Sequence, residues 1–255
     1  MINALRVDIR RYLMTKGFVI LVAFMSIVQP VAIRLAMMGT TKLMHDADSV
    51  NMLEFSSYTS MAGLYLAVVV TMFLHTEAGE GIIRNKIISG KKRHEILFSY
   101  CMVNAMLAAI LQTISVLVTA FAGLCTKAAF EVTCAEVFRF TIVSILAGVA
   151  VSTFYTAIYL CFCTRKAAIA LPVCMAIIMK ILMFVIADAL YTESGIPKVS
   201  GITLMIYKGF DRFVPFAHLT GTLRWDNVSY LIGSLGLIAF SLVIGILAFS
   251  KKDMK

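Results

Sequence analysis

The residues with the clearest potential for chemistry lie in the most polar stretch of the chain, EAGEGIIRNKIISGKKRHE at 77–95. Glu77, Glu80 and Arg84 recur there at spacings of three and four residues, the pattern of one helix face. Such a group would suit a membrane protease, but an intramembrane hydrolase also needs a nucleophile or metal ligands at membrane depth. An i, i+4 ion pair between Glu80 and Arg84, worth roughly 0.3 kcal/mol, is the better interpretation.

Other chemical motifs in the sequence are incomplete. The four histidines form no i, i+4 pair and accompany no G-x-S nucleophile motif. The SGKK of residues 89–92 resembles the end of a phosphate-binding loop. However, Asn85 stands where that motif requires glycine, and Lys92 stands where it requires serine or threonine. The chain is therefore not expected to bind ATP by this device.

The six cysteines do not predict a metal site. Cys161 and Cys163 form a C-x-C pair, but no second pair stands at zinc-ligand spacing. Cys125 and Cys134 flank a short predicted loop and could form a disulfide. The sequence leaves both of their states open.

The composition indicates an all-α integral membrane protein. Of 255 residues, 60% are hydrophobic and only 15% are charged, far from the values of water-soluble domains. At about 20 apolar residues per crossing, the apolar runs predict a single transmembrane domain over 1–255. The predicted spans are roughly 18–38, 58–76, 97–124, 137–161, 167–189 and 229–249.

The segment before the first span predicts a helix that lies in the membrane surface. Leu5, Ile9 and Leu13 fall on one face at helical spacing, with Arg6 and Arg10 elsewhere. We expect residues 1–17 to form this interfacial helix. The apolar run that follows continues too far for a signal peptide, so it is expected to be a retained first span.

The basic residues predict the orientation. With both termini in the cytoplasm, the inner segments carry fourteen lysines and arginines and the outer segments seven, in agreement with the positive-inside rule. The 77–95 stretch is then a cytoplasmic loop of a multi-pass protein of the cell membrane. The net charge of +9 is attributed to these topology signals facing anionic membrane lipid, and no nucleic-acid partner is expected.

Two further features belong to the later spans. Lys180 stands near the middle of the fifth span, where a charge costs roughly 2.5–3.5 kcal/mol on insertion scales. It either lines the route of an anionic or amphipathic substrate, or is paired within the bundle or snorkels from a shifted helix. Asp188 is too far along the helix to be its direct partner. Between spans five and six, residues 200–225 are apolar but too short for two crossings, which predicts short re-entrant or interfacial outer helices.

The 77–95 loop itself favours a short amphipathic helix. Apolar and basic residues alternate at 82–88 over about two helical turns, and Gly90 is well placed to end a helix at its C′ position. A helix of this kind can lie in the groove of a partner protein.

The sequence of this loop, EAGEGIIRNKIISGKKRHEILFS, resembles the first cytoplasmic loop of ABC-type permeases of the type-2 exporter superfamily. An acidic start, a glycine, an I-R-N-K-like core and a G-x-x-R ending recur in that family between spans two and three. The basic amphipathic N-terminus, the six spans, the long outer segment and the FSKKDMK tail agree with the family over nearly the whole chain. In size and loop sequence the chain is similar to bacterial exporters of peptides such as bacteriocins and phenol-soluble modulins.

The resemblance implies a transport subunit and not an enzyme. The loop would contain a coupling helix seated on a separate ATP-binding subunit, which would hold ATP and Mg²⁺, while this chain binds no cofactor. The residues implied to couple to that subunit are Glu77, Glu80, Gly81, Ile83, Arg84, Asn85, Lys86, Gly90 and Arg93.

The implied assembly contains two permeases, either two copies of this chain or one copy with a related chain, because six spans are too few to enclose a pathway in this family. The expected cargo is amphipathic or hydrophobic, most readily a peptide, since no polar channel is evident along the predicted helices. The alternative is a stand-alone membrane enzyme, or an accessory membrane protein of the immunity type, without an ATPase partner.

Overall fold

The computed structural model describes residues 10–11, 18–20, 22–24, 27–28, 31, 49–50, 57–126, 129–130, 133–162, 167–190, 197–218 and 227–250. Within these ranges, five helices are long and apolar enough to cross a membrane. They are α3 (Ser57–Gly79), α5 (Arg93–Thr126), α6 (Cys134–Phe162), α7 (Ala167–Leu190) and α10 (Asn227–Ser250). A multi-pass membrane protein is the class that this architecture defines.

These five helices confirm the predicted spans two to six, and each of their ends lies within four residues of the predicted boundary. The prediction for residues 1–17 and much of the predicted span 18–38 lie outside the described residues. The residues of that span that the structure describes are helical, and Phe18 and Val22 pack against the core of the bundle.

Helix α6 is the centre of the bundle and packs against α3, α5, α7 and α10. Its buried positions are mostly small or aromatic, among them Ala147, Ala150 and Tyr155. Small residues allow neighbouring helices to approach closely, which is the usual way in which membrane helices associate. Asn104 of α5 donates a hydrogen bond of 2.8 Å to the hydroxyl of Thr156 on α6, so buried polar groups also join these helices.

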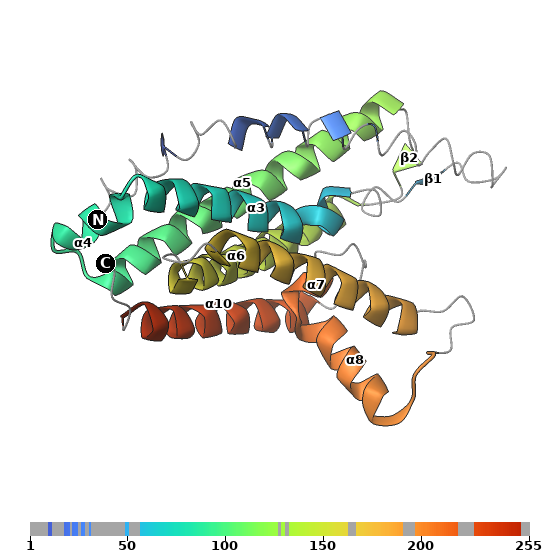
Figure 1. Ribbon diagram of the computed structural model, residues 1–255. Coiled ribbons are helices and arrows are strands. Elements are labelled where there is room, and N and C mark those ends of the chain that lie inside the picture. Colours follow the sequence, from blue (N-terminus) through green and yellow to red (C-terminus); the bar gives the residue numbers. More distant parts are fainter. Residues whose placement is uncertain are drawn as a thin grey trace.

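Glycine sets the distance of α10 from the centre. A Cβ at Gly245 would lie 3.0 Å from Leu97 of α5 and 3.3 Å from Ala157 of α6. Only 17% of the α10 span and 22% of the α7 span are buried, against 56% of α3. Helices α7 and α10 are therefore peripheral (Figure 1). Their exposed apolar side chains form much of the outer surface of the bundle.

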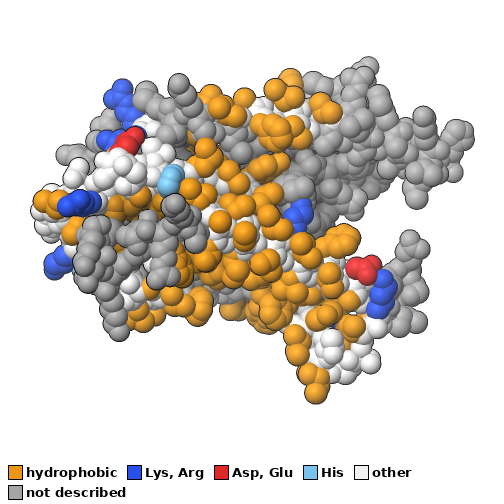
Figure 2. Space-filling view, in the orientation of Figure 1, with side chains coloured by type: hydrophobic (Ala, Val, Ile, Leu, Met, Phe, Trp, Pro, Cys, Tyr) orange, Lys and Arg blue, Asp and Glu red, His pale blue; other side chains and the backbone are white. Residues whose placement is uncertain are grey.

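The remaining elements lie at the two ends of the bundle. Helix α4 (Ile82–Ile88) follows α3 at one end, whereas α8 (Gly201–Phe213) and α9 (Pro215–His218) lie near the other (Figure 1). The expected outer segment therefore contains two short helices. A broad band of hydrophobic side chains lies between the charged groups of the two ends (Figure 2).

One element departs from the purely helical prediction. Two-residue strands β1 (Ser49–Val50) and β2 (Ala129–Phe130) pair in parallel, with Ser49 opposite Ala129. The pairing joins the segment before α3 to the connection between α5 and α6. It is too short to produce a hydrophobic alternation, which explains why the sequence pattern did not indicate it.

Candidate functional site

The polar stretch at 77–95 folds as a helix–turn–helix connection between α3 and α5. Helix α3 ends at Gly79, and Gly81 adopts a left-handed conformation with φ of 69° immediately before α4. Glycine adopts this conformation without the steric penalty that a Cβ would bring. The turn separates Glu80 from Arg84, and the predicted i, i+4 ion pair between them is absent from the described ion pairs. That prediction was wrong because it assumed one continuous helix.

The predicted end of the amphipathic helix is confirmed. Gly90 follows the C-cap residue Ser89 and has φ of 84°. Its amide donates to the carbonyl of Ile87 at 3.0 Å, and the amide of Lys91 donates to the carbonyl of Lys86 at 3.2 Å. These two bonds are those of a Schellman motif, which satisfies the last carbonyls of a helix. The helix is thus closed at its C-terminus by its own backbone.

Helix α4 has an inner face and an outer face. Ile83 is 2% exposed and belongs to the hydrophobic core, and Ile87 packs against that core. On the outer face Arg84 and Asn85 are exposed, and the side chain of Ile88 is 71% exposed. The outer face of α4 therefore presents one exposed apolar side chain among polar residues.

The inner face of α4 contacts an ionic cluster of Arg11, Lys86 and Tyr100 around the buried carboxylate of Glu77, in which only the Arg11 side chain is largely exposed. Glu77 lies in the last turn of α3 and is 2% exposed. Its Oε2 accepts a hydrogen bond of 2.9 Å from the Tyr100 hydroxyl and lies 3.7 Å from the Lys86 ammonium. Its Oε1 accepts a bond of 3.2 Å from Arg11. One carboxylate therefore joins the N-terminal segment, α3, α4 and α5.

Lys86 is held on two sides within this cluster. Its ammonium donates to the Tyr100 hydroxyl at 3.1 Å and lies 4.3 Å from the centroid of the Tyr100 ring. A cation over an aromatic face is stabilised by about 0.5–2 kcal/mol, more when it is shielded from water. Only 14% of the lysine side chain is exposed, so its charge is directed into the bundle.

Arg93, the first residue of α5, connects this end of the bundle to α10. Its guanidinium donates a hydrogen bond of 3.1 Å to the backbone carbonyl of Phe249, near the C-terminus of α10. The last carbonyls of a helix have no partner within the helix, and a cation there also interacts favourably with the helix dipole. Arg93 is therefore part of the internal framework.

The structure separates the nine residues implied to couple to an ATPase into two groups. Glu80, Arg84, Asn85 and Gly90 are exposed. Glu77, Ile83 and Lys86 are directed inward, Arg93 is half-buried, and Gly81 forms the turn. The second group can position a contact surface, but a side chain that is buried in this chain does not itself reach a partner.

Lys180 lies midway along α7 and is half-buried. As expected, Asp188 is not the partner of Lys180, because its carboxylate lies 2.7 Å from the ammonium of Lys198.

At the α8 end of the bundle, Arg212 of α8 donates a hydrogen bond of 3.0 Å to the hydroxyl of Ser229 on α10. Burial raises the pKa of Asp211, its neighbour on α8.

The sequence pattern did not indicate Arg11 and Tyr100 as members of the ionic cluster. Tyr100 follows the buried Ile96 and Leu97 at helical spacing, so it shares their inward face. Lys86 likewise stands three residues after Ile83 and one before Ile87, on the apolar face of α4. That spacing was the available signal that Lys86 points inward. Arg11 had no comparable signal.

Cys134 is an exposed free thiol, while the side chain of Cys125 lies outside the described part of the chain. Within that part, no three His, Cys, Asp or Glu side chains gather to hold a metal ion. The sequence matches no protein-family model and no curated protein.

Proposed function

We propose that the chain is the transmembrane subunit of an ATP-driven exporter, with α4 as the helix that couples it to a separate ATP-binding subunit. The observation that carries the proposal is the two-sided construction of α4. One side is anchored to the bundle by a buried isoleucine and a buried ion pair, and the other presents Arg84, Asn85 and Ile88 to the surroundings.

This construction suits a helix that transmits force. Removing one partner of a buried ion pair leaves an uncompensated charge and costs about 3–5 kcal/mol, so α4 resists separation from α3 and α5. A push on its outer face is then transmitted to the spans themselves. ATP-driven closure of the partner would shift the packed helices between two arrangements, as switching interfaces require.

The proposed assembly contains two permease chains, either two copies or one copy with a related chain. The peripheral position of α7 and α10 leaves wide apolar surfaces that a second chain or lipid can cover. The proposed cargo is an amphipathic or hydrophobic peptide, in keeping with the resemblance to bacterial peptide exporters. The alternative, a membrane enzyme or immunity-type protein without an ATPase, predicts that no nucleotide-binding subunit accompanies the chain.

Co-purification in mild detergent tests the proposal. The wild-type chain should retain a subunit that hydrolyses Mg-ATP, and Arg84→Glu combined with Ile88→Glu should lose it. Both changes are on the exposed face, so the yield and melting temperature of the chain itself should stay close to wild type. Lys208→Glu, at an exposed position of α8, is the matched control and should retain the ATPase. Normal ATPase recovery with the double variant would refute coupling through α4.

We also propose that both chain termini and α4 face the cytoplasm. In a background without native cysteines, Val199→Cys should react with a membrane-impermeant thiol reagent on intact cells. Ser89→Cys should react only after the membrane is made permeable. The reverse labelling pattern would overturn the orientation.

Lys180 is the proposed cationic contact for cargo, with a role in bundle packing as the alternative. Lys180→Met removes the charge and retains an apolar side chain of similar length. If the ammonium contacts cargo, export of an acidic peptide should fall while the melting temperature of the complex is unchanged or higher, because the insertion cost disappears. A large loss of thermal stability would favour the packing role instead.

A further inference from the structure

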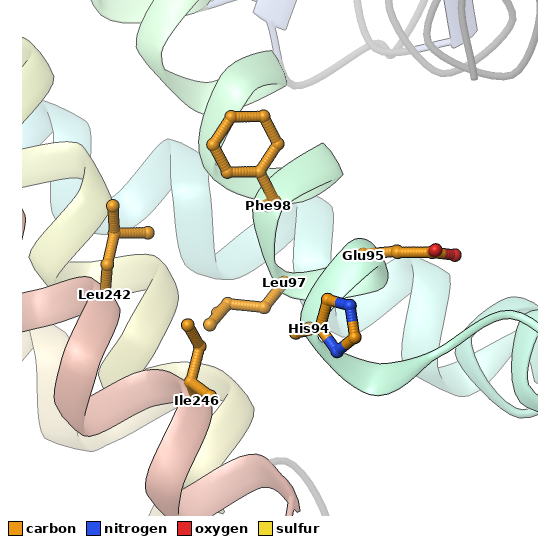
Figure 3. A pocket seen from close by; sticks show the side chains of 6 residues that line it. All are labelled: His94, Glu95, Leu97, Phe98, Leu242 and Ile246. Carbon is orange, nitrogen blue, oxygen red and sulfur yellow. The ribbon is translucent and has the colours of Figure 1, made fainter.

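A crevice of about 220 Å³ lies between α5 and α10 at the α4 end of the bundle (Figure 3). It is lined by His94, Glu95, Leu97, Phe98, Leu242 and Ile246. The volume is below the roughly 300–1,000 Å³ of pockets that enclose a drug-sized ligand. Its inner wall is hydrocarbon, so it suits a segment of an apolar chain and offers little to a sugar or a nucleotide.

The crevice is open to the surface through which a membrane protein meets lipid. Phe98 is 45% exposed and Ile246 is 43% exposed, and both belong to helices long and apolar enough to span a bilayer. The crevice floor is Leu97, against which Gly245 allows α10 to pack closely. The walls are thus fixed by helix packing, and the open side faces the bilayer.

Basic residues directly precede the part of α5 that lines the crevice. Lys91 and Lys92 are exposed and directly precede α5, and residues 91–95 contain three lysine and arginine side chains and one carboxylate. Figure 3 shows the carboxylate of Glu95 directed away from Leu242 and Ile246. The carbonyl of Lys92 accepts bonds of 3.0 and 3.2 Å from the amides of Glu95 and Ile96, which fixes the lysine to the first turn of α5.

We propose that this crevice binds an anionic phospholipid, with part of an acyl chain between α5 and α10 and the phosphate near Lys91 and Lys92. The apolar wall and the two exposed lysines that precede α5 match the two chemical parts of such a lipid, and their order along the chain places the positive charge toward the helix start. Clusters of basic residues next to a membrane helix attract anionic headgroups. The site is separate from the exposed face of α4 and does not depend on ATPase coupling.

Quenching of a single tryptophan by brominated lipids tests this site. Trp225, the one tryptophan of the sequence, is replaced by phenylalanine, and Phe98→Trp places the reporter in the crevice. Leu117→Trp, on an exposed position of α5 far along the helix from its basic start, serves as the control. Each variant is reconstituted in vesicles of phosphatidylcholine with increasing amounts of brominated phosphatidylglycerol, or of brominated phosphatidylcholine as the neutral reference.

At position 98 phosphatidylglycerol should bind more tightly than phosphatidylcholine by at least about fivefold, the factor expected from either lysine alone near an anionic headgroup. At position 117 the ratio should be close to one. Lys91→Gln combined with Lys92→Gln should bring the ratio at position 98 down to that of the control. Equal ratios at both positions, whether high or low, would overturn the proposal, as would a preference that survives the loss of both lysines.

Discussion

The two ends of the helical bundle are held together by different means. At the α4 end, the buried carboxylate of Glu77 collects contacts from Arg11, Lys86 and Tyr100. At the α8 end, the ion pair of Asp188 and Lys198 is short at 2.7 Å, but the two side chains are 62% and 51% exposed. Exposed pairs contribute about 0–1 kcal/mol, whereas breaking buried ones is costly. A short distance alone therefore does not identify the stronger connection.

At the α8 end, apolar packing contributes more than ion pairs to holding the helices together. The rings of Phe154 and Tyr155 on α6 each meet Phe216 of α9 edge to face, with centroids 6.3 and 6.0 Å apart. A small displacement of such rings leaves no charge uncompensated, whereas separating a buried ion pair does. We therefore expect the α4 end to be the more rigid of the two ends, which the proposed coupling role of α4 would require.

The largest expected effect is that of Glu77→Ala. This change leaves the buried ammonium of Lys86 without its carboxylate and should lower the free energy of unfolding by about 3–5 kcal/mol. Unfolding by heat or denaturant in detergent measures it. The control Glu80→Ala, at an exposed position three residues on, should change stability by no more than about 0.5 kcal/mol.

Should Glu77→Ala fail to accumulate, Glu77→Gln keeps an acceptor for Tyr100 while removing the charge. It should then lose less stability than the alanine variant and more than Glu80→Ala. Equal stability of the Glu77 and Glu80 variants would contradict the proposed difference between a buried cluster and an exposed turn.

A smaller effect is expected for Gly233→Ala at the α8 end. A Cβ at this position of α10 would overlap the backbone carbonyl of Phe213, the last residue of α8. The α8–α9 connection must move to admit it, and overpacking of this kind typically costs about 1–3 kcal/mol. Gly236→Ala, three residues on and with nothing within 4 Å of the added methyl group, should be neutral or slightly stabilising.

The melting temperatures of the two glycine variants give the measurement. Because the α8 end is held by apolar packing that can shift, Gly233→Ala should cost less than Glu77→Ala. A larger loss at Gly233 than at Glu77 would reverse the order of rigidity assigned to the two ends.

The smallest effect is expected for Asp188→Asn. The ion pair with Lys198 is exposed and screened, so its loss should change the free energy of unfolding by about 0–1 kcal/mol, and less at high salt. Melting curves at two salt concentrations would measure this. A loss of stability comparable to that of Glu77→Ala would show that the exposed pair also contributes strongly to the stability of the fold.

The spans were predictable from the sequence because their signal is additive over many residues. In α3, α5, α6, α7 and α10, hydropathy over some 20 positions outweighs any single polar residue, even Lys180. The end of α4 was also predictable, since glycine at C′ has a specific conformational cause at Gly90.

The ionic cluster was not predictable in the same way. Glu77 and Lys86 are nine residues apart, and they meet only because Gly81 turns the chain between two helices. Linear spacing treated 77–84 as one helix, so it placed Glu77 with Glu80 and Arg84 on a common surface. Contacts such as Arg11 with Glu77 span 66 residues and follow from tertiary packing, which no local pattern contains.

The bond between Arg93 and the carbonyl of Phe249 joins residues 156 positions apart in the chain. During synthesis, residues 77–95 leave the ribosome long before the final span exists. Arg93, at the start of α5, therefore cannot form this bond until Phe249 of α10 has been made. The outer face of α4 is therefore presented on a complete framework only after α10 has been inserted. If α4 couples to an ATPase as proposed, this order of events would favour recruitment by finished chains over recruitment by truncated ones.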